Sequence, residues 1–178
     1  MTNTLIHFPL PEWVQLIPIC DVDTAEQTMV NIIANSQDHG QARLAEYESA
    51  ASDVIDGAIE HGIWVLGLAT PPGRPAALLS VTGFQVPITL DRHTTTDLLS
   101  YLEAHGGPGI AGLRFAPLSY GQTALILHRT DSSGSQAQAF VPDADGQGCF
   151  LFTLAAQQPD RGAELLELVR EIVTTAMP

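Results

Sequence analysis

The stretch QAQAFVPDADGQGCFLFTLAAQQPDRGAELLELVREIVTTA, residues 136–176, decides the fold. In residues 136–141, Gln136, Gln138 and Phe140 alternate with smaller apolar residues, which is a strand pattern of period two. Residues 142–148 are turn formers, and the segment from Cys149 onward is continuously apolar, as a buried strand would be. The stretch therefore predicts two strands joined by a tight turn.

A long amphipathic helix is predicted to follow these strands, over residues 160–176. Pro159 sets φ for a first helical turn, and Asp160 can accept from the free backbone N–H groups. We expect the helix to lie across the sheet that the two strands help to build. Its apolar positions are Leu165, Leu168, Val169, Ile172, Val173 and Ala176, and its polar positions are Glu164, Glu167, Arg170 and Glu171.

The N-terminal part contains two further predicted helices, residues 21–39 and 41–61. Residues 13–19 precede them as either a short strand or an extended lead-in, and Asp21 or Asp23 caps the first helix. Gly62 closes the second helix, and the sequence leaves open whether the two helices fuse. The expected apolar faces are Val22, Ala25, Met29, Ile32 and Ile33, then Leu44, Tyr47, Ala51, Val54, Ile55 and Ala58.

The middle of the chain alternates strand patterns with turn formers. The predicted strands are 63–69, 76–86, 109–118 and 123–129, and a helix is predicted at about 94–105. Short turns join most of these strands, so they are expected to pair antiparallel. The sequence predicts a single α+β domain over residues 1–178, with an antiparallel sheet of about five to seven strands (residues 63–178), packed helices and the acidic helical segment 21–61.

The net charge of −13 is concentrated in the N-terminal part of the chain. Residues 1–62 hold ten acidic residues against Arg43 alone. A negative surface repels phosphate backbones and anionic lipid, which argues against nucleic acid and membrane partners. The charge serves either solubility or a basic protein partner that binds residues 21–60. The candidate partner-binding residues are Glu46, Glu48, Asp53 and Asp56.

No targeting or membrane-spanning pattern is present in the sequence. The first ten residues lack a basic start and a long apolar run, so the expected compartment is the cytoplasm. Cys20 and Cys149 are too few for a disulfide scaffold, and each is expected to be a small buried apolar residue, with its redox state left open. Five aromatic residues are dispersed along the chain, and most of them are expected in core or half-buried positions: Trp13, Tyr47, Trp64, Tyr101 and Tyr120.

Two short motifs resemble a catalytic loop and a metal-binding loop, but the other residues that each site needs are missing. The letters HGGPG at residues 105–109 match an oxyanion-hole loop of some α/β-hydrolases, but no Gly-x-Ser-x-Gly elbow follows, so a helix end and turn is favoured. Asp143-x-Asp145 resembles the start of a calcium loop, but Leu154 stands where its glutamate is needed, which favours a hairpin turn. The six histidines show no zinc spacing, so no catalytic residue, metal or cofactor is expected.

The closing pattern resembles that of a known group of proteins. Its letters are AFVP at 139–142, FLFTL at 150–154, Pro159-x(4)-Glu-Leu-Leu at 159–166 and EIVTT at 171–175. These look like a set of uncharacterised actinobacterial proteins, some encoded beside type VII secretion genes, which are similar in layout to the PsbP-like α/β sandwich. The resemblance implies an antiparallel sheet covered by helices and a secretion-associated role. It implies no functional residue.

Three functions remain open after this reading. The first is a non-catalytic protein-interaction or accessory protein, motivated by the acidic helical segment and by the failure of the catalytic patterns. The second is a small-molecule-binding domain with an apolar pocket between sheet and helices. The third is an enzyme whose residues converge only in space. The sequence leaves a homo-oligomer open.

Overall fold

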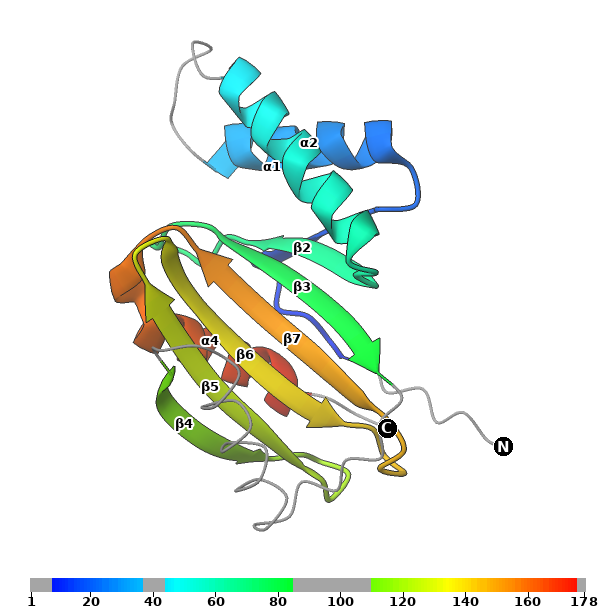
Figure 1. Ribbon diagram of the computed structural model, residues 1–178, viewed down its shortest axis with the longest axis vertical. Coiled ribbons are helices and arrows are strands. Elements are labelled where there is room, and N and C mark those ends of the chain that lie inside the picture. The colour runs from blue at the N-terminus through cyan, green and yellow to red at the C-terminus, as the bar shows by residue number, and fades with distance from the viewer. Residues whose placement is uncertain (1–7, 37–43, 85–109, 176–178) are drawn as a thin grey trace. The chain divides into compact units, whose positions relative to one another are not determined.

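The computed structural model describes residues 8–36, 44–84 and 110–175, with the backbone alone for residues 36, 44–49 and 111 (Figure 1). These residues form seven strands and three α-helices, and all the strand pairings described below are antiparallel. The predicted α+β class is therefore confirmed. The chain divides into an N-terminal unit, Glu12–Thr82, and a C-terminal unit, Met1–Pro11 with Gly83–Pro178. The prediction of a single domain stays a prediction.

The N-terminal unit contains three strands, β1 (Val14–Ile17), β2 (Val65–Ala69) and β3 (Ala77–Phe84). β1 pairs with β2, and β2 pairs with β3 with Val65 opposite Val81. A tight turn joins β2 to β3, in which the Arg74 N–H donates to the Pro71 carbonyl at 3.1 Å. Of the two alternatives for residues 13–19, the short strand is correct.

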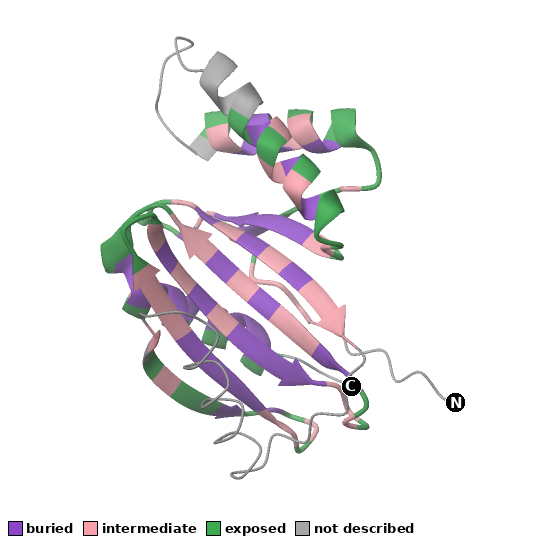
Figure 2. Ribbon diagram, viewed as in Figure 1, coloured by how far each residue is buried: buried purple, intermediate pink, exposed green. Residues whose placement is uncertain are grey.

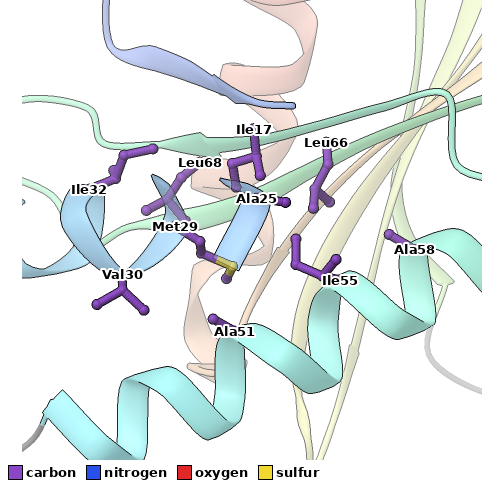
Figure 3. Packing of buried hydrophobic residues seen from close by; sticks show 10 residues of the cluster. All are labelled: Ile17, Ala25, Met29, Val30, Ile32, Ala51, Ile55, Ala58, Leu66 and Leu68. Carbon is purple, nitrogen blue, oxygen red and sulfur yellow. The ribbon is translucent and has the colours of Figure 1, made fainter. Parts of the chain in front are cut away.

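Two helices of the N-terminal unit, α1 (Val22–Ser36) and α2 (Leu44–Glu60), pack on each other and on the strands. Figure 3 shows side chains from α1, α2, β1 and β2 that point toward one another. Because α1 and α2 contribute to one cluster, they are separate helices and not one fused rod. The buried cluster comprises Ile17, Ala25, Met29, Val30, Ile32, Ala51, Ile55, Ala58, Leu66 and Leu68.

A Schellman turn ends α2 and aims the chain into β2. The Ile63 N–H donates to the Ala58 carbonyl at 2.9 Å, and the Gly62 N–H donates to the Ile59 carbonyl at 3.1 Å. Gly62 has a φ of 63°, a left-handed conformation that costs a glycine little. Ile63 packs on the same cluster as the helices. The predicted closure of the helix at Gly62 is confirmed.

The C-terminal unit contains four strands in an antiparallel meander. They are β4 (Ile110–Pro117), β5 (Thr123–Asp131), β6 (Gly134–Pro142) and β7 (Cys149–Ala156). Figure 2 shows buried and partly buried residues alternating through most of β6, as the period-two pattern predicts. In β7 the buried residues are Cys149, Phe152 and Leu154, and the others are partly buried, so the strand is less buried than its apolar sequence predicts. The hairpin loop at residues 143–148 closes with the Asp143 N–H donating to the Gly148 carbonyl at 3.0 Å. The hairpin interpretation of Asp143 and Asp145 is therefore confirmed.

The C-terminal helix lies across this sheet, as the sequence predicts. A 3-10 turn, η2 (Pro159–Arg161), leads into α4 (Gly162–Thr174), and α4 packs mainly on β5 and β6. Pro159 occupies the first turn as expected, but the residue at the cap position is Gln158, whose side chain makes no capping hydrogen bond. The buried positions of α4 are Gly162, Leu165, Leu166, Leu168, Val169, Ile172 and Val173.

Two expectations about burial, for Val22 and Cys20, are wrong. Val22 is exposed because it stands at the first position of α1, before the helix reaches the core. Cys20 is exposed because it lies in the turn between β1 and α1, whereas Cys149 is buried as predicted. Trp64 is exposed as well. The predicted helix 94–105, residues 105–109 and Ala176 lie outside the described residues.

Candidate protein interface

The outer face of α2 carries three exposed carboxylates: Asp53, Asp56 and Glu60. The spacing of three and four residues places them on neighbouring turns of one helix face. Asp53 and Asp56 are two of the four candidate partner-binding residues, and the structure brings them together. Glu46 and Glu48 belong to the same helix, but their side chains lie outside the described residues.

The packing of the opposite side of α2 explains why this face points outward. Ala51, Ile55 and Ala58 are buried in the core of the N-terminal unit, with Ile55 completely inaccessible. The Schellman turn holds the end of α2, and the imidazole Nδ1 of His61 donates to the Gly57 carbonyl at 2.7 Å. His61 thereby satisfies one of the last carbonyl groups of α2. The acidic face therefore stands on a firmly anchored helix.

The carboxylates of this face have no ion-pair partner among the described residues. In residues 12–36 and 44–82, Arg74 is the single Arg and no Lys is present. In the C-terminal unit, by contrast, Glu167 pairs with both Arg114 and Arg170. Among the described residues of this unit, the carboxylates of the α2 face therefore have no counter-charge in an ion pair.

Two exposed apolar side chains, Ile59 and Trp64, flank the Schellman turn. Ile59 is 48 % exposed and Trp64 is 61 % exposed. Burying an exposed aromatic side chain of this size is a common source of binding free energy. The sequence indicates the exposure of Ile59, because this residue lies outside the apolar stripe of α2. The sequence does not indicate the exposure of Trp64, because strand alternation groups Trp64 with the buried Leu66 and Leu68.

Outside this face, His128 is a partly buried polar group that the sequence does not single out. Its ring on β5 lies between two glycines, since a Cβ on Gly112 or Gly162 would approach it to 2.7 Å. Gly112 has a φ of 63° and belongs to the irregular step in the β4–β5 pairing. Burial, with the charge of Arg114, lowers the pKa of His128 below its ordinary value. This histidine is accordingly a neutral packing group at neutral pH.

A second polar group of residues, Tyr120, Asp143 and Cys149, lies where the β4–β5 and β6–β7 turns meet. The Tyr120 hydroxyl donates to the Pro142 carbonyl at 2.7 Å. Burial raises the pKa of the Cys149 thiol to about 12, and the Asp143 charge acts in the same direction. Burial and Asp143 also raise the pKa of Tyr120. A thiol that stays protonated is a poor nucleophile, so this group is suited to structure and not to thiolate chemistry.

Neither metal-binding geometry nor a helical membrane span is found in the described part of the chain. Its His, Cys, Asp and Glu side chains form no cluster of three that could hold a metal ion. Its helices are too short or too polar to cross a membrane.

Comparison with known proteins adds no assignment. No family model matches the chain, and neither a curated protein nor a solved structure matches it.

Proposed function

We propose that this protein is a non-catalytic protein-interaction or accessory protein whose acidic α2 face binds a basic protein partner. The observation that carries the proposal is the group of exposed carboxylates Asp53, Asp56 and Glu60, which have no counter-charge among the described residues of their unit. Complementary charge speeds encounter and selects partners. A secretion-associated role and a cytoplasmic location belong to the same proposal, and they follow from the resemblance and from the sequence pattern.

The paired charges of the C-terminal unit support the choice of α2. Glu164 and Glu167 are held by arginines of their own unit, so a partner would have to compete with existing ion pairs. Asp53 and Asp56 require no such exchange. A basic partner therefore gains more from α2 than from α4.

A pull-down from lysate of the source cells, at low and moderate salt, tests the proposal. The wild-type protein should enrich a basic protein whose recovery falls as salt rises, because salt screens exposed charges. Reversing Glu46, Glu48, Asp53 and Asp56 to Arg should abolish the enrichment while the circular dichroism spectrum stays unchanged. As a control for the described pair, Asp53→Arg/Asp56→Arg is compared with Asp160→Arg/Glu171→Arg, which changes the charge equally on exposed residues of the other unit. Equal recovery by both double variants would refute the proposal.

A further inference from the structure

The apolar side chains beside the acidic face narrow the chemistry of the partner. Ile59 follows Asp56 by three residues and precedes Glu60, so it borders the acidic face on the helix surface. Trp64 lies just beyond the Schellman turn. Its backbone N–H donates to the Val81 carbonyl at 2.8 Å, which fixes the backbone of Trp64 at the start of β2. The carboxylates therefore adjoin the exposed Ile59 at the C-terminal end of α2, and the exposed Trp64 follows directly after the turn that ends this helix.

This end of α2 is held in place by a hydrogen bond from β3 and by packing on the buried cluster. The Gly62 carbonyl accepts from the Thr82 hydroxyl of β3 at 3.4 Å, and Ile63 packs on the buried cluster. A pre-organised surface loses little conformational entropy when it binds. Ile59 and Trp64 are thus presented on rigid backbone although their side chains face solvent.

We infer that the α2 face binds an amphipathic basic segment of a protein, in which Lys or Arg side chains meet Asp53, Asp56 and Glu60 while an apolar side chain covers Ile59 and Trp64. The inference rests on the proposed function and adds the apolar anchor to it. Charge complementarity selects the basic side of the occupant, because three carboxylates that lack a counter-charge among the described residues border Ile59. The exposed fraction of Trp64 selects the apolar side, because an aromatic anchor gains stability when water is excluded from it.

The test uses two synthetic peptides of equal length and equal positive charge. Both are helical with Lys along one face, and the opposite face carries Leu in the first peptide and Ala in the second. The full chain carries Trp13→Phe, so that the fluorescence reports Trp64 alone. The Leu peptide should shift the Trp64 emission to shorter wavelength and bind about tenfold more tightly than the Ala peptide at moderate salt, as burial of apolar side chains predicts.

Variants separate the two halves of the surface. Ile59→Ser should remove most of the preference for the Leu peptide, and Asp53→Arg/Asp56→Arg should weaken both peptides together. If Ile59→Ser perturbs the fold, protection of Trp64 from acrylamide quenching by the Leu peptide gives the same information in the unaltered chain. Equal affinity for the two peptides would overturn the apolar anchor while leaving a purely electrostatic partner in place. Binding of neither peptide also overturns the inference, and the pull-down then decides independently whether the α2 face binds a basic protein.

Discussion

The two units of the molecule handle charge in opposite ways. In the C-terminal unit, Arg161 is almost completely buried and its guanidinium pairs with Glu164 at 2.6 Å, while Glu167 bridges two arginines. In the N-terminal unit, the carboxylates of α2 face solvent without a cation among the described residues. Similar amphipathic helices can therefore use their polar faces differently. Glu164 and Glu167 of α4 pair with arginines of their own unit, whereas Asp53 and Asp56 of α2 have no ion pair among the described residues.

The largest effect on stability should come from truncating a buried side chain in the core of each unit. Ile55→Ala in α2 and Ile172→Ala in α4 each truncate a completely buried side chain, so each should lower the free energy of unfolding by about 2–5 kcal/mol. Urea unfolding followed by circular dichroism measures both. If α2 is the binding element, Ile55→Ala should also reduce recovery of the partner at temperatures where Ile172→Ala does not. Identical loss of recovery in the two variants would remove the distinction between the units.

The Schellman turn gives the next effect. Gly62→Ala places a Cβ on a left-handed residue and should cost about 1–2 kcal/mol of unfolding free energy. Space is not the cause, because nothing lies within 4 Å of the added Cβ. The matched control is Gly57→Ala within α2, which also meets nothing within 4 Å and should stabilise the helix slightly. A destabilisation of equal size at both positions would contradict the role given to the turn.

His128 should make the stability of the C-terminal unit depend on pH. Its folded pKa is lowered, so the unfolded chain binds the proton first as pH falls. Stability is therefore complete above the ordinary pKa of 6.5 and is lost as pH falls through that value toward the lower folded pKa. Urea unfolding of the wild type and of His128→Asn at pH 7.5 and at pH 5.5 measures the contribution of His128 to the pH dependence of the free energy of unfolding. A wild-type loss no larger than that of the variant would show that His128 is not the group responsible.

The ion pairs of α4 should contribute the smallest measurable effect. Glu167→Gln removes the pairing with Arg114 and Arg170, whose side chains are about half exposed, so the expected cost is about 0.5 kcal/mol or less. The cost should shrink further in high salt. Thermal unfolding at two salt concentrations measures it, and a loss above about 1 kcal/mol would mean that these exposed pairs matter more to the fold than surface pairs usually do.

Periodicity was enough to predict most of the fold. The alternation in residues 136–141 and the helical spacing from Leu165 to Val173 are local patterns. Both predict the observed element correctly, because the hydrophobic face of each element is also its buried face. The polar candidates Asp53 and Asp56 were predictable for the same reason, since a residue opposite the apolar stripe of a helix is exposed.

The remaining features depend on contacts between distant parts of the chain. Trp64 is exposed although strand alternation groups it with the buried Leu66 and Leu68, so alternation alone does not predict its exposure. The slot around His128 requires an irregular step in β4 and the start of α4, which are about fifty residues apart in the sequence. Such features follow from tertiary packing, which overrides local preference.

The most direct test of the central claim is a map of the residues that the captured basic partner contacts. Backbone amide resonances of the isotope-labelled chain would be recorded with and without that partner. The shifted or broadened amides should gather in the second half of α2 and across Gly62 to Trp64, and those of α4 should be unaffected. Shifts that gather on α4 or on β4–β7, with residues 50–64 unchanged, would contradict the central claim.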